Sequence, residues 1–189
     1  PHYDKSVLEA LREPLEDHRI LISRVQSKIE YPAKFLFAAS MNPCPCGNLL
    51  STTKVCRCSD VEILRYKNRL SDPFLDRIDL FVTMNEPKVG DDYDVTSQEL
   101  HTKVKEAFLF QKQRGQEEFN GKLDEAHIKK YCTLTPEASE TLKTGVNRFN
   151  LSYRGENKVL RVARTIADLA LSHMIEKGHI IEALGYRKR

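Results

Sequence analysis

The sequence has 189 residues, of which 40% are hydrophobic and 30% charged, the composition of a globular protein. No apolar run approaches the roughly 18 residues that a membrane span requires, and the N-terminus lacks the apolar stretch of a secretory signal. These features exclude a membrane protein and favour the cytoplasm. The net charge of +3 does not by itself indicate a nucleic-acid partner.

Positive charge gathers near the C-terminus. Residues 143–189 carry ten Lys or Arg and four Asp or Glu, so this segment is the basic part of the chain. The sequence does not begin with Met, and we therefore expect it to be part of a longer protein.

The first third of the chain begins with a predicted helix over residues 4–13, which Pro14 ends or kinks. Two short β-rich runs at 20–24 and 27–31 predict a hairpin. The continuous apolar run FLFAAS at 35–40 is typical of a strand buried on both faces of a parallel sheet.

Helical signals and a second apolar run follow a cysteine-rich loop. Residues 59–70 predict a helix, because Ser59 and Glu62 have the spacing of a capping box. Residues 72–77 predict a short helical turn, and IDLFVTM at 78–84 predicts another buried strand. We therefore expect an α/β fold with parallel strands in this part of the chain.

The remainder of the chain is predicted to be helical. The polar stretch 85–94 contains Pro and Gly and is typical of a linker. The helical segments that follow are 96–115, 124–132, 135–149, 152–174 and 177–186. The sequence therefore predicts two domains, an α/β domain over 1–88 and a helical bundle over 89–189.

Four of the five cysteines, Cys44, Cys46, Cys56 and Cys58, form two C-x-C pairs. Four thiolates can close a tetrahedral Zn²⁺ site, and ligands in two close pairs are typical of structural zinc, with no open position for catalysis. The alternatives are free or oxidised thiols, and a redox or iron–sulfur role. Cys132 stands alone on a predicted helix and is expected to be a core residue. An odd number of cysteines without a secretory signal favours a reducing compartment.

Two polar residues flank the predicted strands. Asn42 follows the first strand, at the sheet edge where ligands of α/β folds collect. It either orients a water or a phosphate, or forms a turn before Pro43. Arg77 either pairs with the nearby Asp76 and Asp79 or acts as an arginine finger on a neighbouring subunit's nucleotide.

The long C-terminal helix carries a basic stripe of Arg154, Lys158 and Arg161, spaced at i, i+4 and i+7. Cations near a helix N-terminus oppose the helix dipole, so a phosphate held by Arg154 would compensate for them. The alternative is a solvated basic face with Glu156 nearby.

Three longer motifs contain these positions: FLFAASMNPCPCG, RYKNRLSDPFLDRIDLFV and LSYRGENKVLRVARTIADLA. They resemble the Mg-chelatase-like AAA+ ATPases of bacteria, of the ComM/YifB type, and the resemblance covers nearly the whole chain. It implies part of an AAA+ P-loop core with parallel strands, helices and a β-hairpin insertion, followed by an α-helical lid bundle. No G-x4-G-K-[ST] motif occurs, and neither does the acidic pair that holds Mg²⁺. We therefore expect the chain to begin after Walker B and to be inactive alone.

The resemblance also implies roles for single residues. Asn42 would sense the γ-phosphate and the attacking water, and Arg77 would be the arginine finger acting in trans. Arg154 would reach the nucleotide from the lid, and Arg161 is the next candidate on that helix. ATP and Mg²⁺ would be the cofactors of the full-length protein. A finger supplied by a neighbour requires a homo-oligomeric ring, expected to be a hexamer.

The hairpin bears on the substrate. In relatives such hairpins touch DNA, so Arg19, Arg24 and Lys28 would contact phosphates; the alternative is an ordinary polar hairpin. The expected function is ATP-driven DNA remodelling, for instance branch migration in recombination or natural transformation. The alternatives are an ATPase that drives metal insertion into a tetrapyrrole, and a zinc-stabilised interaction module without enzymatic activity.

Overall fold

The computed structural model describes residues 3–25, 27–86, 90 and 94–187. The predicted domain boundary between residues 88 and 89, and most of the predicted linker at 85–94, lie outside the described residues. The chain divides into two compact units. Unit 1 comprises residues 1–78 and 83–88, and unit 2 comprises residues 79–82 and 89–189.

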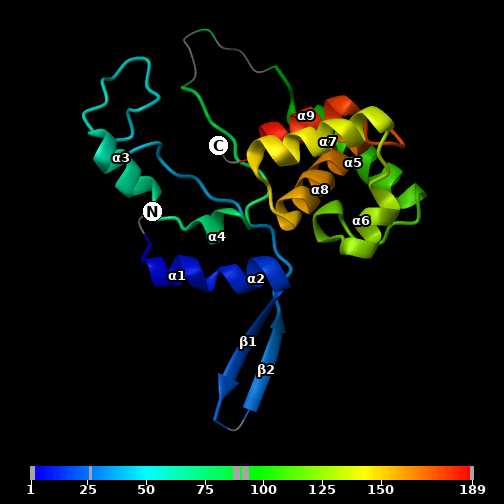
Figure 1. Cartoon of the computed structure of the whole chain (residues 1–189), viewed down its shortest axis with the longest axis horizontal. Helices are drawn as coiled ribbons and strands as arrows, with labels where there is room; N and C mark the ends of the chain where they lie inside the picture. The colour runs from blue at the N-terminus through cyan, green and yellow to red at the C-terminus, as the bar shows by residue number, and fades with distance from the viewer. Residues whose placement is uncertain (1–2, 26, 87–89, 91–93, 188–189) are drawn as a thin grey trace. The chain divides into compact units, whose positions relative to one another are not determined.

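The described residues of unit 1 form four short helices and a hairpin (Figure 1). The elements are α1 (Lys5–Ala10), α2 (Arg12–Asp17), β1 (Arg19–Arg24), β2 (Ser27–Pro32), α3 (Asp60–Lys67) and α4 (Asp72–Leu75). The helix predicted over 4–13 is interrupted at Leu11, so Pro14 falls in the first turn of α2. There the missing N–H of proline costs no intrahelical hydrogen bond.

The predicted hairpin and capping box are confirmed. β1 and β2 pair as antiparallel strands, and the N–H of Ala33 donates to the carbonyl of His18 at their base (2.7 Å). At the start of α3 the N–H of Ser59 donates to Glu62 Oε2 (2.8 Å), while the N–H of Glu62 donates to Ser59 Oγ. These local signals specify both elements without help from distant residues.

The parallel strands predicted at 35–40 and 78–84 do not form, and this part of the fold prediction is wrong for the structure. Among the described residues the only sheet is the β1–β2 pair. Apolar side chains of both segments face solvent, with Leu36 93% exposed and Met84 80% exposed. A central strand requires hydrogen-bonded neighbours on both sides, and the described part of the chain supplies none.

A small core and a few polar contacts hold unit 1 together. Ser71, the N-cap of α4, donates its hydroxyl to Glu9 of α1, and Arg12 donates to the same carboxylate (2.7 Å). The hydrogen bond from Ser71, with that from Arg12, lowers the pKa of Glu9. Phe37 and Phe74 meet edge to face with ring centroids 6.3 Å apart. Helices α1 and α4 are therefore joined by specific contacts rather than by a large apolar interface.

Unit 2 is a bundle of helices. It contains α5 (Ser97–Gln113), a 3-10 turn η1 (Asn120–Lys122), α6 (Glu125–Tyr131), α7 (Pro136–Phe149), α8 (Tyr153–Leu169) and α9 (Lys177–Gly185). Helix α8 contacts α5, α6 and α9, and α7 packs on α9. A Cβ at Gly145 of α7 would lie 2.5 Å from Leu184 Cδ1, so the close approach of α7 and α9 requires this glycine.

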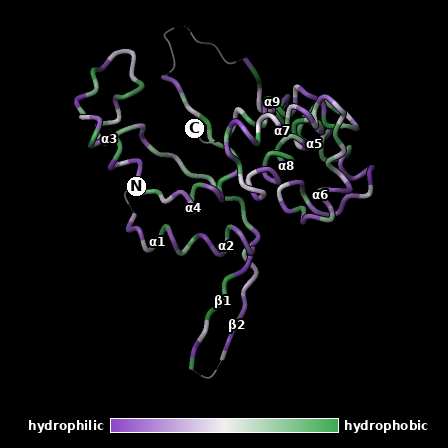
Figure 2. The backbone as a smooth tube through the Cα atoms, in the orientation of Figure 1, coloured by the Kyte–Doolittle hydropathy of each residue, from purple (hydrophilic) through white to green (hydrophobic). Residues whose placement is uncertain are grey.

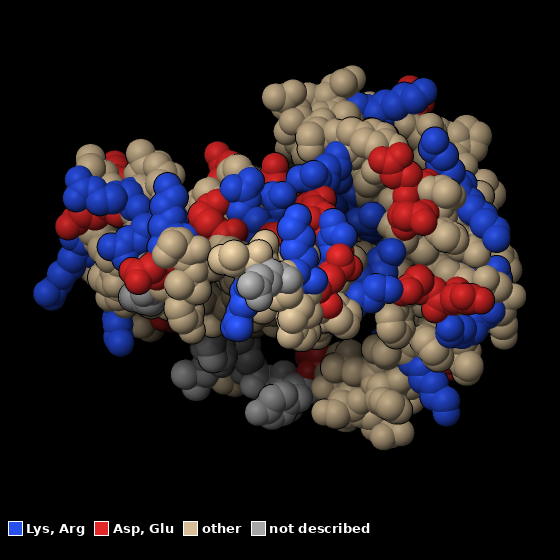
Figure 3. All heavy atoms as spheres, turned by 90° about the horizontal axis from the view of Figure 1, so that it is seen from below, with Lys and Arg blue, Asp and Glu red and all other residues tan. Residues whose placement is uncertain are grey.

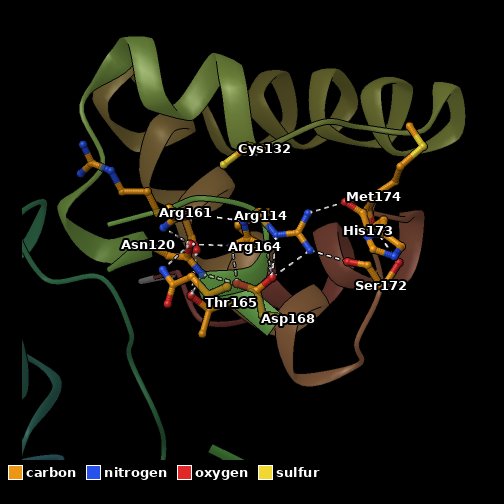
Figure 4. Close-up of polar contacts among 12 residues, drawn as sticks. Arg114, Asn120, Cys132, Arg161, Arg164, Thr165, Asp168, Ser172, His173 and Met174 are labelled. Atoms are coloured by element: carbon orange, nitrogen blue, oxygen red, sulfur yellow. Dashed lines mark hydrogen bonds and ion pairs between the residues drawn. The ribbon is translucent and has the colours of Figure 1, made fainter. Parts of the chain in front are cut away.

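A buried polar network lies inside unit 2 and centres on Asp168 of α8 (Figure 4). Its carboxylate accepts hydrogen bonds from Arg114 (2.7 Å), Asn120 (2.7 Å) and Arg164 (3.1 Å). Burial lowers the pKa of Arg164, and the charge of Asp168 opposes that shift. The network therefore joins the end of α5, the η1 turn and α8 around a single carboxylate.

The same arginine fixes the connection from α8 to α9. Arg164 is completely buried, and its guanidinium donates to the carbonyls of His173 (2.9 Å) and Ser172. The loop between α8 and α9 is therefore held by hydrogen bonds to the guanidinium of Arg164. The helix predicted over 152–174 ends earlier, at Leu169, because the chain then enters the left-handed region at Leu171 (φ 53°).

We expect Asp168→Ala to destabilise unit 2 by about 3–5 kcal/mol, because it leaves two arginine charges without a carboxylate, one of them fully buried. Urea unfolding followed by circular dichroism measures the change. Glu140→Ala, at an exposed position of α7, is the control and should shift stability by less than about 0.5 kcal/mol. Equal effects of the two substitutions would contradict the role assigned to Asp168.

Cys132 is confirmed as a core residue and makes stability depend on pH. Its thiol lies in the unit 2 core, and burial raises its pKa from 9.0 to about 11. The protonated thiol is favoured in the fold, so its contribution is complete below pH 9 and is lost as the pH rises through 11. The difference in unfolding free energy between the parent and Cys132→Ala should change by about 2 kcal/mol between pH 7.5 and 10.5. A difference that does not vary with pH would contradict this prediction.

Candidate functional site

The structure brings the four paired cysteines to one point. The Sγ atoms lie 3.4 Å apart in Cys44 and Cys46, 3.7 Å in Cys44 and Cys56, and 3.6 Å in Cys46 and Cys56. All four sulfurs, including that of Cys58, lie within 4.8 Å of one another. A tetrahedral Zn²⁺ site with Zn–S bonds of about 2.3 Å has S···S edges of about 3.8 Å. The cluster therefore has dimensions that can hold a metal ion, and its sulfurs are too far apart for disulfide bonds.

Backbone N–H groups point at the sulfurs. The N–H of Asn48, with that of Arg57, donates to Cys46 and lowers its pKa to about 6. The N–H of Cys46 favours the Cys58 thiolate, but burial and the three neighbouring thiols outweigh it and raise the pKa of Cys58 to about 12. Four thiols this close cannot all ionise without a cation among them, which is the chemistry of a metal ligand set.

The loop between the two cysteine pairs is fixed at its far end by Glu86. Its Oε2 accepts hydrogen bonds from Ser51 Oγ (3.1 Å) and from the N–H of Thr52 (3.2 Å). Ser51 Oγ in turn accepts from the N–H of Lys54 (3.0 Å). The sequence carries no local signal for Glu86, because its partners lie more than thirty residues away along the chain.

Asn42 lies directly beside the cysteine cluster. Its side chain is exposed, and a Cβ added at Gly47 would lie 3.7 Å from Asn42 Nδ2. Gly47 has a φ of +81° and donates its N–H to the carbonyl of Cys44 (3.1 Å). Because the parallel sheet is absent, Asn42 does not stand at a sheet edge. The turn at Cys44 and Gly47 places it instead.

Arg77 is engaged within unit 1. Its side chain is 12% exposed, Nε donates to the carbonyl of Arg12 (3.0 Å), and NH1 donates to the carbonyl of Pro73 (2.6 Å). Glu16 of α2 lies 3.3 Å from Nε and forms an ion pair with it. The role of Arg77 as an arginine finger stays a prediction, and in this arrangement the guanidinium serves local acceptors.

The three basic residues of α8 do not form one exposed stripe. Arg154 is exposed in the first turn of the helix. Lys158 is buried, and its Nζ lies 2.6 Å from Asp79 Oδ1. Arg161 is half-buried and donates to the carbonyl of Leu123. The expectation of a continuous basic face is therefore wrong, and of the two proposed nucleotide contacts, Arg154 and Arg161, only Arg154 is exposed.

One face of the hairpin is largely apolar. Ile20 pairs with Tyr31 and Ile22 with Ile29, and each of these side chains is 42–48% exposed. Arg24 lies on the same face, next to the turn. Figure 2 shows hydrophobic stretches along the hairpin, which extends beyond α2. The hairpin thus offers an exposed aromatic and aliphatic surface beside a cation.

The other face of the hairpin is mostly polar but includes Leu21. Arg19 and Lys28 lie on it, and Arg19 NH1 pairs with Glu30 Oε2 at 3.1 Å. Figure 3 looks along the hairpin, where Lys and Arg side chains stand out around its end. Of the three predicted phosphate contacts, Arg24 and Lys28 lie near the turn, whereas Arg19 is partly neutralised by Glu30.

Comparison with known proteins identifies the family. The profile "Magnesium chelatase, subunit ChlI" matches residues 1–91, and "Magnesium chelatase, subunit ChlI C-terminal" matches residues 94–187. The chain belongs to the Mg-chelatase-like family. Relatives include competence protein ComM of Haemophilus influenzae, 39% identical over 99% of this chain, and YifB of Salmonella typhimurium, 38% identical over 99%. YifB of Escherichia coli is also 38% identical over 99% of the chain.

The chain corresponds to only part of the length of these relatives. The chain spans 37% of the length of ComM and 37% of the length of each of the two YifB proteins. None of the helices in the described part of the chain has the length and apolar character needed to cross a membrane. The ComM/YifB resemblance inferred from the three motifs is therefore confirmed at the level of the family.

Proposed function

We propose that the full-length protein is an AAA+ ATPase that forms a homo-oligomeric ring, a hexamer, in the cytoplasm. The observation that carries this proposal is the consecutive match of both magnesium-chelatase profiles along nearly the whole chain. ATP and Mg²⁺ would be bound with residues that precede this chain in the full-length protein. The segments 35–40 and 78–84 would then be strands, because neighbouring strands would complete their hydrogen bonds.

The candidate site residues fit this activity to different degrees. Asn42 presents an exposed carboxamide, which can hydrogen-bond a phosphate or a water. Arg154 presents a cation from the first turn of a well-packed helix. Arg77 can act in trans only if its guanidinium exchanges Glu16 and two carbonyls for a neighbour's phosphate. Assembly of the ring is the step that would drive that exchange.

We infer that DNA is the substrate of the motor. The hairpin combines Tyr31 and three isoleucines on one face with Arg24 and Lys28 near its turn. Aromatic and apolar groups stack on bases, and cations contact phosphates, so the surface suits a nucleic acid. One relative is named a competence protein, and we extend that context to this protein as DNA remodelling during natural transformation or recombination.

The full-length protein should hydrolyse ATP and bind DNA with an affinity that falls as salt rises. Arg24→Ala/Lys28→Ala should weaken DNA binding about tenfold or more at low salt, because two phosphate contacts are lost. Arg19→Ala should have a smaller effect, because Arg19 is already paired with Glu30. Fluorescence anisotropy with labelled single-stranded, duplex and branched DNA measures binding, and phosphate release measures turnover.

Other outcomes favour the alternatives. ATP turnover without DNA binding at low salt would favour a motor that drives metal insertion into a tetrapyrrole. Absence of both ATP turnover and DNA binding would favour a non-enzymatic interaction module. Lys129→Ala, at an exposed position of α6 in unit 2, removes a positive charge outside the hairpin and is the control; it should leave DNA affinity within about twofold.

We infer further that Cys44, Cys46, Cys56 and Cys58 hold one structural Zn²⁺. Protein purified under reducing conditions should contain about one equivalent of zinc per chain, measured by mass spectrometry. Cys56→Ser/Cys58→Ser should contain less than about a tenth of an equivalent, whereas Cys132→Ala should retain the metal. A parent protein with as little zinc as the double variant would refute the site.

A further inference from the structure

The contacts around Asn42 show what holds it in place. Its side chain is exposed, and among the described residues no hydrogen bond engages its carboxamide. The carboxamide faces Gly47, because Nδ2 and Cγ lie 3.7 Å and 3.9 Å from the point that a Cβ at residue 47 would occupy. Asn42 is also joined to the cysteine cluster through the chain, because Cys44 follows it by two residues. The direction of its side chain therefore depends on how the segment from Cys44 to Gly47 is held.

Gly47 is fixed by the cysteine cluster. It directly follows Cys46, and its N–H donates to the carbonyl of Cys44, so the first and third residues of its turn are cysteines of the cluster. Its φ of +81° is a conformation that other residues rarely adopt. The clamp at Glu86 holds only the far end of the loop, near Ser51 and Thr52. The position of Gly47 therefore depends on whether the sulfurs are drawn together.

We propose that the metal-loaded cysteine cluster is the positioning device for Asn42, so that loss of zinc lowers the rate of ATP turnover through Asn42. The inference rests on the proposed ATPase function. Without metal, the cluster is held by thiol contacts of 3.4–3.7 Å, which are weak hydrogen bonds at most. With metal, coordinate bonds to all four sulfurs fix Cys44 and Cys46. They also fix the turn that these residues form with Gly47, which the side chain of Asn42 faces.

The test is a double-mutant cycle in the full-length protein. Asn42→Ala should lower kcat by about 10²-fold, the effect expected when one oriented polar group is lost near a reacting phosphate. Cys56→Ser/Cys58→Ser removes the metal without substituting any residue of the turn from Cys44 to Gly47, and should lower kcat about tenfold with little change in KM. The combined variant should be no slower than Asn42→Ala alone, because both changes act on one group.

Two controls separate positioning from general damage. Cys132→Ala removes a thiol outside the cluster and should leave kcat unchanged within about twofold. Removal of zinc from the parent with a chelator, followed by zinc addition, should lower and then restore kcat. Recovery excludes misfolding as the cause of the loss.

Hydrogen–deuterium exchange of the full-length protein gives a reading that does not depend on ATP. Chelation should speed exchange in peptides that cover residues 39–48. Faster exchange confined to residues 49–58 would overturn the inference, and so would additive losses of kcat in the combined variant. A parent protein that binds zinc but does not turn over ATP contradicts the proposed function instead, and the exchange experiment then still decides whether the metal orders the segment around Asn42.

Discussion

The convergence of four sulfur atoms within 4.8 Å constrains unit 1 more than its small apolar core does. Thiols at this separation cannot ionise together, so the cluster is either a set of mostly neutral thiols or a ligand set around a cation. Backbone N–H groups lower the pKa of Cys46, whereas burial and the neighbouring thiols raise the pKa of Cys58, so four thiolates require a cation among them. The same convergence closes the loop, fixes Gly47 and so decides where Asn42 stands.

Unit 2 solves a similar problem with protein groups alone. Asp168 is surrounded by Arg114, Asn120 and Arg164, so a buried charge is balanced by buried donors and no ion is needed. A fixed network of this kind holds α8 within its unit. Arg154 lies at the exposed start of α8, so its backbone is held by a helix that is packed within unit 2.

Local signals in the sequence predicted the elements that local physics specifies. The hairpin, the capping box at Ser59 and the helices of unit 2 follow from periodicity and capping, and the structure has them. The prediction of strands at 35–40 and 78–84 is wrong for the structure because a buried strand requires hydrogen-bonded neighbours, which no property of the segment itself supplies. Glu86 and the burial of Lys158 were equally invisible, because each depends on a partner far away in sequence.

Two features of unit 1, its exposed apolar segments and the locally paired Arg77, fit the proposed assembly. Leu36 and Met84 are exposed, and both belong to apolar segments, so their exposure is costly in water. Arg77 forms an ion pair with Glu16 and donates to backbone carbonyls, so its positive charge is paired within unit 1. The proposed function accounts for both features. The strands of a complete core would bury the apolar segments, and a neighbour's nucleotide would offer Arg77 a stronger anion than Glu16. Under the proposed function, exposed apolar segments and a locally paired Arg77 are therefore expected in unit 1 until the rest of the core and a neighbouring subunit are present.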